Sequence, residues 1–438
     1  MTQVRQPQSR AVLDESWGTT EDAPMGIRLH IALALALGLP IPGVILQLDS
    51  ANHLAVRAPQ ETDARDGEAA MPGAITDAAR ERIEERCLEY LWGLYEAKRF
   101  PGCSAALVLP DGSSLTFPVG LADVEAERDM TSQDRMLSGS IGKTYVTAAA
   151  HKLMLAGKLS WDQRAVEFFA GEDWFLRVPN AETMTLKQLL RHQSGIARHV
   201  FKPEFLPDCY ADPDRTWKPE ELLAYVFDEE PLFEAGTNWA YADTNYIVIG
   251  MIIERVAKKP FYEYVRDEFL TPLKLADTVP SDSRRIPGLT QGYIAAFQGT
   301  GVPERVLEDG VFFCNPQFEW CGGGYASTSL DLARWAHVLY GGEAMEGDYL
   351  TSMLETVPAR LGPNKEYGLG VMVASTDLGP AIGHDGIMTG FGATVSHFPE
   401  QGISAALMLN TDDSRILGMP LDRVSQQLTR FAAEELSK

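Results

Sequence analysis

Residues 140–159 read SIGKTYVTAAAHKLMLAGKL and predict one helix at the centre of the fold. If Ser140 opens this helix, Lys143 lies three residues further along the same face, within reach of the serine hydroxyl. The helix N-terminus adds a positive field and free backbone donors there. Small residues at 148–150 let the helix pack on several sides, as a buried helix does. The pair offers the activated hydroxyl and the nearby base that acyl transfer requires, and the alternative is a serine cap beside an exposed lysine.

The segments that precede this helix predict a helix and then a hairpin. Thr76 or Asp77 can cap a helix that ends before Pro101-Gly102. Its apolar positions recur at helical spacing and are Ile83, Cys87, Leu91 and Leu94. Two strand-like runs, 104–109 and 114–119, are joined by Pro110-Asp111-Gly112, which is a hairpin signal.

The segments that follow it are helical and then return to strands. Helices are predicted at 186–191, 219–227, 245–256 and 421–436, and strands at 367–374, 393–398 and 403–409. This order predicts an α+β fold in which helices flank an antiparallel sheet and a helical domain is inserted. We expect a sheet domain from 76–139 plus 290–438 and a helical domain from 140–289.

The first 75 residues differ from the rest and are interpreted as a tail and linker. Residues 1–24 are polar without an apolar period, which favours disorder. Residues 31–39 are apolar but too short, and too soon followed by Pro40 and Pro42, for a membrane span. A signal-peptide core from Met25 fits better, although acidic residues precede it and no clean cleavage site follows Leu48. The sequence leaves periplasmic, secreted and cytoplasmic locations open.

Composition excludes several classes of function. The 438-residue chain has 38 basic and 61 acidic side chains, a formal net charge of −23, which disfavours binding to nucleic acid or to an anionic membrane surface. The five cysteines form no Cys-x-x-Cys pair, which argues against a disulfide framework or a zinc site. Neither a phosphate-binding glycine loop nor clustered metal ligands occur, so we expect no cofactor and no metal.

Five motifs in order resemble the class C β-lactamase and D-alanyl-D-alanine carboxypeptidase superfamily, within the serine β-lactamase and penicillin-binding proteins, over about residues 80–435. The superfamily also contains related esterases, D-amino-acid amidases and acyltransferases. Ser140-Ile-Gly-Lys143 resembles its first motif. The others are Thr185–Ile196 (TLKQLLRHQSGI), Trp239–Tyr246 (WAYADTNY), Cys321–Thr328 (CGGGYAST) and Gly383–Gly386 (GHDG).

The resemblance assigns a role to each matching residue. Ser140 is the implied nucleophile, Lys143 the catalytic base within hydrogen-bond reach of it, and Tyr241 the group that relays the serine proton and later activates water. The backbone N–H groups of Ser140 and Ile387 are implied to form the oxyanion hole, and Gly386 lets that strand approach closely. Core packing is the alternative for Tyr241, and also for Trp239 and Trp320 as pocket residues. His192 is interpreted as structural.

Two residues depart from the β-lactamase pattern. Asp243 stands where the family usually has asparagine, and a carboxylate accepts hydrogen bonds but does not donate them. It suits a substrate group that donates, or a salt bridge that shifts the pKa of Lys143. His384 stands where many β-lactamases have lysine, and it is largely neutral at pH 7; a surface histidine is the alternative. We therefore expect neutral esters or amides to react faster than anionic β-lactams.

The function expected from this resemblance is a metal-free serine hydrolase of esters or D-configured amides and peptides, acting through an acyl-Ser140 intermediate. The alternatives are a β-lactamase or D-alanyl-D-alanine carboxypeptidase, an acyltransferase of the same fold, and a non-catalytic penicillin-binding-like sensor. A sensor is expected to lack Ser140, Lys143 or Tyr241, and all three are present. The expected partner is a small-molecule substrate, and the oligomeric state is left open.

Overall fold

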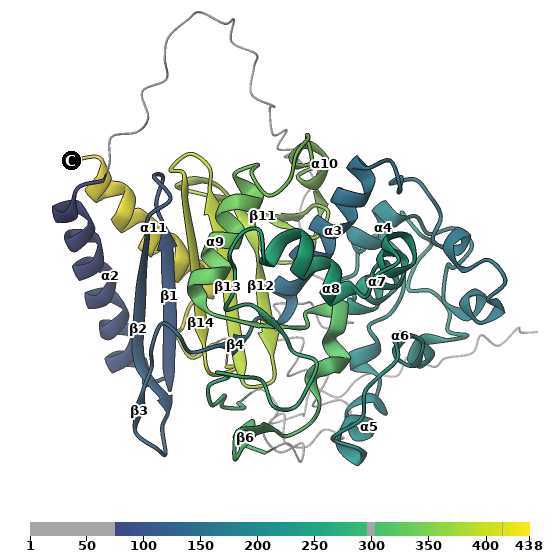
Figure 1. Cartoon of the computed structure of the whole chain (residues 1–438), viewed down its shortest axis with the longest axis horizontal. Coiled ribbons are helices and arrows are strands. Elements are labelled where there is room, and N and C mark those ends of the chain that lie inside the picture. Colours follow the sequence, from purple (N-terminus) through teal and green to yellow (C-terminus); the bar gives the residue numbers. More distant parts are fainter. Residues whose placement is uncertain (1–74, 296–302, 414) are drawn as a thin grey trace, which may run out of the picture.

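The computed structural model describes residues 75–438 apart from 296–302 and 414. In this part of the chain, one antiparallel sheet has the spatial order β3-β2-β1-β14-β13-β12-β11-β10-β9 (Figure 1). Its strands are β1 (Gly102–Val108), β2 (Ser114–Asp123), β3 (Arg128–Asp129), β9 (Val357–Pro358), β10 (Lys365–Tyr367), β11 (Met372–Thr376), β12 (Gly379–Met388), β13 (Phe391–Phe398) and β14 (Ile403–Leu409). The N-terminal hairpin therefore pairs with the last strand of the chain.

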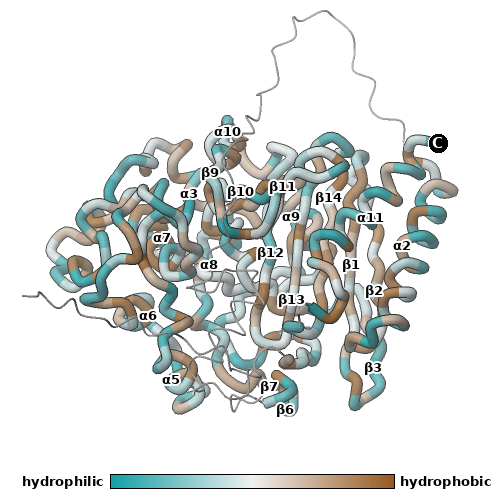
Figure 2. The backbone as a smooth tube through the Cα atoms, turned by 180° about the vertical axis from the view of Figure 1, so that it is seen from behind, coloured by the Kyte–Doolittle hydropathy of each residue, from teal (hydrophilic) through white to brown (hydrophobic). Residues whose placement is uncertain are grey.

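Helices cover both faces of this sheet. On one face lie α2 (Asp77–Lys98) and α11 (Leu421–Leu436), and on the other lies α9 (Ser329–Tyr340) (Figure 1). Side chains alternate between the faces of a strand, so Ala105 of β1 packs into the cluster beneath α2 and α11, whereas Ala106 packs into the opposite cluster. In Figure 2 the coil of α2 alternates between hydrophilic and hydrophobic colours, as expected of a helix with one buried face.

The remaining helices lie beside the end of the sheet that is opposite to β2 and α2 (Figure 1). They are α3 (Lys143–Leu155), α4 (Leu186–Leu190), α5 (Phe205–Ala211), α6 (Pro219–Leu223), α7 (Asp243–Ala257), α8 (Phe261–Val265) and α10 (Leu350–Met353). Helices α3 and α7 contact each other and are almost wholly buried, because both present small or apolar residues on most sides. Two small sheets complete the described part, one of β4 (Met136–Leu137), β8 (Tyr325–Ser327) and β5 (Val279–Pro280), the other of β6 (Leu307–Glu308) and β7 (Val311–Phe312).

Most of the predicted elements are confirmed, and the α+β class with an antiparallel sheet is confirmed too. Thr76 caps α2 through its side chain, which accepts from the Ala79 N–H, and α11 has the predicted bounds. One prediction is wrong, because the expected strand 367–374 is two strands, β10 and β11, separated by a turn at Gly368–Val371. Glycine at 368 and 370, the latter with a φ of 69°, makes this turn possible. The helix predicted over 140–159 ends earlier, at Leu155.

Several expectations concern residues outside this description, namely the tail and the signal-peptide core at 25–48. Within the described residues no helix is long and apolar enough to cross a membrane. All five cysteines lie buried as free thiols.

Candidate active site

Ser140 lies in a short 3-10 turn, η2 (Gly139–Gly142), directly before α3, and not within the α-helix itself. A 3-10 turn also places residues three apart on one side, so the expected contact with Lys143 forms. The Lys143 Nζ donates to the Ser140 Oγ at 2.9 Å. The serine is 9% exposed and lines a cavity, whereas Lys143 is fully buried beneath it. The Ser140 hydroxyl is therefore accessible from the cavity, whereas the Lys143 amine that contacts it is not.

The Lys143 amine has three acceptors. Besides Ser140 it donates to the Asp243 Oδ1 at 2.6 Å and to the Gly322 carbonyl. Burial is the largest single influence and would lower the pKa of this lysine, but the charges of Asp243, Tyr241 and Glu319 together outweigh burial, and the pKa is raised. An ammonium group has three N–H donors, so all three are used. Lys143 is therefore a fixed cation at the nucleophile.

Asp243 is the first residue of α7 and is shared by two cations. Its Oδ2 accepts from Arg198 at 2.9 Å (Nε) and 2.6 Å (Nη2), while its Oδ1 accepts from Lys143. Burial would raise the pKa of the carboxyl, but Arg198 and Lys143 together hold it well below its usual range. Of the roles expected for Asp243, the structure shows the salt bridge. Two cations offset the Asp243 carboxylate, and Asp243 does not line the cavity, so it presents no uncompensated negative charge to an anionic substrate.

Tyr241 lines the same cavity as Ser140. Its ring centroid is 4.9 Å from the Lys143 Nζ, and its buried hydroxyl has no well-formed hydrogen bond to any described residue. Burial raises the pKa of Tyr241, and the Lys143 charge opposes that shift without cancelling it. Ser140 and Lys143 also lie close enough to the Tyr241 hydroxyl to lower this pKa. A hydroxyl that is unpaired beside a serine and a cation is suited to exchanging a proton with that serine.

Strand β12 passes the nucleophile at backbone distance. A Cβ on Gly386 would lie 2.0 Å from the Ser138 carbonyl oxygen, and one on Gly139 would lie 2.7 Å from the Ile387 nitrogen. Gly139 also has a φ of 51°, which favours glycine. Strand β11 pairs with β12 only as far as Gly383, so beyond it this edge of β12 faces the Ser140 turn. The close approach brings together the two backbone segments, at Ser140 and Ile387, that were expected to supply the oxyanion donors.

His384 is placed differently from its expected position at the substrate. It is 2% exposed, and it lines a smaller cavity that adjoins the Ser140 cavity and not the Ser140 cavity itself. Both of its ring nitrogens have protein partners, the Tyr367 hydroxyl at 3.0 Å and the Asp385 carbonyl at 2.6 Å. Burial, followed by the charge of Lys143, lowers the pKa of His384 to about 4, so the ring is neutral. Through these two contacts His384 connects β12 with Tyr367 of β10.

The cavity at Ser140 has a volume of about 590 Å³. One wall is strand β12, and another comes from the segment 361–372. A third is made by Asp412, Arg415 and residues 418–423, which lead into α11. Neither Trp239 nor Trp320 lines it; both are buried, as the core-packing alternative predicted. Its charged lining residues in the described chain are three carboxylates and three cations: Asp385, Asp412, Asp422, Lys365, Arg415 and Arg423. The cavity is balanced in charge although the protein is strongly acidic.

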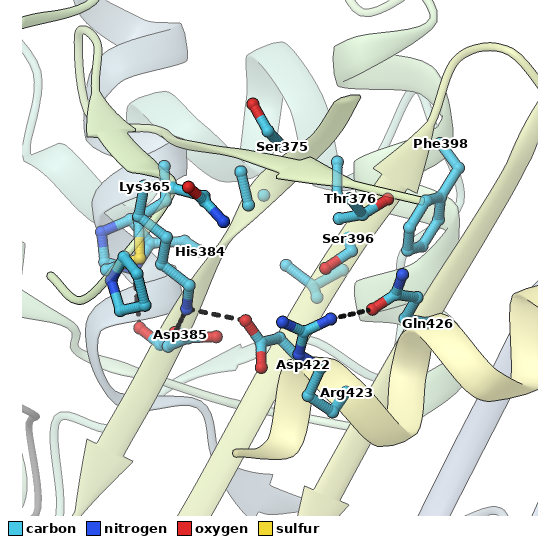
Figure 3. Close-up of a pocket in the computed structure, with 17 residues that line it drawn as sticks. Lys365, Ser375, Thr376, His384, Asp385, Ser396, Phe398, Asp422, Arg423 and Gln426 are labelled. Atoms are coloured by element: carbon cyan, nitrogen blue, oxygen red, sulfur yellow. Dashed lines mark hydrogen bonds and ion pairs between the residues drawn. The ribbon is translucent and has the colours of Figure 1, made fainter. Parts of the chain in front are cut away.

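A smaller cavity of about 50 Å³ adjoins the first and shares Lys365 and Asp385 with it. Figure 3 shows the Lys365 amine between two carboxylates, Asp385 at 3.1 Å and Asp422 at 2.7 Å. Beside them Arg423 donates to Gln426 (Figure 3). Asp385, next to His384 in sequence, therefore forms an ion pair with Lys365. Through Lys365, these ion pairs connect β12 with β10 and α11.

Sequence reasoning missed three residues around the site. Arg198 follows the helix-to-loop motif and carries no signal of its own, although it offsets Asp243. Tyr367 lies within a strand-like run and bridges two histidines. Glu319 lies near Lys143, and burial, followed by the charge of Asp243, raises its pKa to about 7. In the described residues no group of three or more His, Cys, Asp or Glu side chains could hold a metal ion.

Comparisons with known proteins agree with this geometry. The family model described as Beta-lactamase matches residues 81–423. "Penicillin-binding protein 4" of Amycolatopsis lactamdurans is 26% identical over 329 residues, which is 71% of this chain and 81% of that protein. A D-stereospecific amidohydrolase from Streptomyces sp. has a TM-score of 0.64 and 26% identity, covering 76% of this chain and 97% of the other. A D-amino acid amidase from Ochrobactrum anthropi SV3 has a TM-score of 0.68 at 23% identity, covering 80% and 98%, and shows the fold alone.

Proposed function

Because this chain belongs to the Beta-lactamase family and is a serine hydrolase, we propose that Ser140 is its nucleophile and that Lys143 and Tyr241 assist it. The observation that carries the proposal is the 2.9 Å contact between the Lys143 Nζ and the Ser140 Oγ, at the floor of a cavity of about 590 Å³. A buried, fixed cation beneath an accessible serine stabilises the alkoxide that attacks a carbonyl.

The proposed reaction has two halves. The Ser140 oxygen attacks the substrate carbonyl while its proton passes to the ionised Tyr241 oxygen, and the backbone N–H groups of Ser140 and Ile387 stabilise the developing oxyanion. Tyr241 then gives that proton to the leaving group, and an acyl-Ser140 ester remains. In the second half Tyr241 takes a proton from water as that water attacks the ester carbonyl. Tyr241 then returns the proton to the Ser140 oxygen as the acyl–oxygen bond breaks and the acid leaves, which restores the serine hydroxyl and the ionised tyrosine. Lys143 stays an ammonium throughout, since Asp243 holds its charge.

The proposed substrates are esters and D-configured amides or peptides. The similarity to the D-stereospecific amidohydrolase supports this proposal, since that protein is 26% identical and its structure covers 76% of this chain. The charge-balanced cavity suits neutral substrates. A β-lactam is the second candidate, favoured by the offset of Asp243 by Arg198 and by the 26% identity to a penicillin-binding protein. Transfer of the acyl group to an alcohol or amine differs only in which nucleophile the cavity admits.

Covalent capture tests the assignment of the nucleophile. A fluorophosphonate probe should add its mass to the tryptic peptide that contains Ser140, and Ser140→Ala should not be labelled. Ser138→Ala is the matched control, because that serine lies two residues away but donates to the Tyr325 carbonyl. Labelling that persists in Ser140→Ala would overturn the assignment. A panel of p-nitrophenyl esters, D- and L-amino-acid amides and nitrocefin then separates the substrate classes.

A further inference from the structure

A chain of hydrogen bonds behind the cavity joins the segment that carries Tyr241 to strand β12. It starts at the backbone N–H of Ala242, which donates to the His192 Nδ1 at 3.2 Å. The His192 Nε2 then lies 3.1 Å from the Tyr367 hydroxyl, which lies 3.0 Å from the His384 Nε2. It ends where the His384 Nδ1 meets the Asp385 carbonyl at 2.6 Å. The three side chains are buried.

The direction of every bond in this chain is fixed from its two ends. A backbone N–H is only a donor, so the His192 Nδ1 must be the bare nitrogen and its Nε2 must carry the proton. A backbone carbonyl is only an acceptor, so the His384 Nδ1 carries its proton and its Nε2 is bare. Burial lowers the pKa of both rings, which are therefore neutral. The Tyr367 hydroxyl must accept from His192 and donate to His384.

The chain connects two parts of the proposed machinery. His192 receives the N–H of the residue after Tyr241, and its ring lies 4.1 Å from the Tyr241 ring. His384 lies three residues before Ile387 on the same strand. Tyr367, from β10, is the one side chain between the two rings.

We infer that Tyr367 is a positioning residue, whose hydroxyl bridges His192 and His384 in their opposite tautomers and so fixes Tyr241 relative to strand β12. This inference rests on the proposed function, because the need for that alignment is the reaction at Ser140. Tyr367 touches neither Ser140 nor the cavity, since it is absent from the cavity lining. Its loss should therefore reduce turnover more than substrate affinity.

The tautomers test the chain without any reference to activity. With ¹⁵N-labelled histidine, the ring nitrogens should report an Nε2–H form for His192 and an Nδ1–H form for His384. His192→Gln and His384→Gln variants assign the two sets of signals. The same tautomer on both residues, or a charged ring at neutral pH, would overturn the inference even if the enzyme hydrolyses esters well. Inactivity towards every substrate, with the tautomers as described, would instead count against the proposed function.

Kinetics test the positioning role. Tyr367→Phe should lower kcat about tenfold or more and leave KM within about twofold, because the alignment and not the binding surface is lost. Tyr340→Phe is the matched control, since that hydroxyl is also buried but has no hydrogen-bond partner in the described chain. Equal kcat values for the two variants would overturn the role of Tyr367.

A second pair of variants keeps the test decisive if Tyr367→Phe fails to fold. His384→Gln retains an acceptor near the position of the Nε2, whereas His384→Leu has none. His384→Gln should keep at least about tenfold more turnover than His384→Leu, at similar KM. Equal turnover in these two variants would contradict the chain.

Discussion

At the scale of single residues, Lys143 determines how the site titrates. Its ammonium has a carboxylate on one side and a carbonyl on another, so it is held as a cation and is not available as a proton acceptor. The proton of Ser140 must then move to a neighbour. We propose Tyr241, whose hydroxyl has no well-formed hydrogen bond among the described residues and lies close enough to Ser140 and Lys143 for both to lower its pKa. The pH dependence of catalysis follows from the pKa of that tyrosine.

We expect kcat/KM to rise with pH up to at least about pH 9. The ordinary pKa of tyrosine is about 10, and burial raises that of Tyr241 further, so the reactive ionised form grows roughly tenfold per pH unit below it. Initial rates on a neutral p-nitrophenyl ester between about pH 6 and pH 9.5 measure this, with thermal unfolding checked at each pH. A plateau near pH 7 would instead assign the base to a group such as Glu319, whose pKa is about 7.

Asp243→Asn should destabilise the protein by roughly 3–5 kcal/mol, because it leaves Lys143 and Arg198 buried without their counter-charge. The pKa of Asp243 is depressed in the folded state, so its stabilisation is fully present above the ordinary pKa of about 3.9 and is lost only as the pH falls further. Urea unfolding at pH 7 measures the loss. Combining Asp243→Asn with Arg198→Met should recover part of it, and strictly additive losses would contradict the shared ion pair.

At the scale of elements, the site depends on how closely β12 approaches η2. Gly386→Ala would place a methyl group where the Ser138 carbonyl lies, at 2.0 Å, so the strand must move away. Losing one oxyanion donor costs about 100- to 1000-fold in kcat, and we expect a fall of that order. Gly93→Ala in α2 is the control, because a Cβ there meets nothing within 4 Å. Near-normal turnover in Gly386→Ala would remove Ile387 from the oxyanion site.

The sequence predicted elements well where a local signal exists. The capping Thr76, the turn at Pro110-Asp111-Gly112 and the strong period of 421–436 each gave correct bounds or nearly so. The break between β10 and β11 was missed, because Gly368 and Gly370 lie in an otherwise strand-like run. Arg198 and Tyr367 could not be predicted, since their partners are distant in sequence and only the fold brings them together. The burial of His384 beside the smaller cavity could not be predicted either, because the resemblance gives a motif position and not the direction of a side chain.

At the scale of the whole molecule, the site draws on two regions far apart in the chain. Ser140 and Tyr241 come from residues 140–289, which we propose form the helical domain, and Gly386 and Ile387 come from the proposed sheet domain of 76–139 plus 290–438. Residues of both proposed domains line the cavity. Its wall of Asp412, Arg415 and residues 418–423 adds charged groups from the end of the sheet domain.

The net charge of −23 should make the rate with anionic substrates depend on salt. The cavity itself is balanced, so only the long-range field opposes an anion, and that field is screened as the Debye length falls from about 30 Å at 0.01 M to about 4 Å at 0.5 M. The kcat/KM of a p-nitrophenyl hemisuccinate, divided by that of p-nitrophenyl butyrate, should rise several-fold over this range. A ratio independent of salt would mean that the balanced charges of the cavity, and not the net charge of the protein, determine the rate with an anionic substrate.

The pairing of β1 with β14 also determines how late in its synthesis the chain can complete its sheet. Cys103 lies opposite Leu409, so roughly 300 residues separate the two partners. At the ribosome, where synthesis runs at about 5–20 residues per second, the first hairpin waits on the order of 15–60 s for its neighbour. During that interval the apolar faces of β1 have no cover from β14 or α11. The nascent chain therefore exposes these apolar residues for that time, and we expect no acyl transfer before β12 has been synthesised.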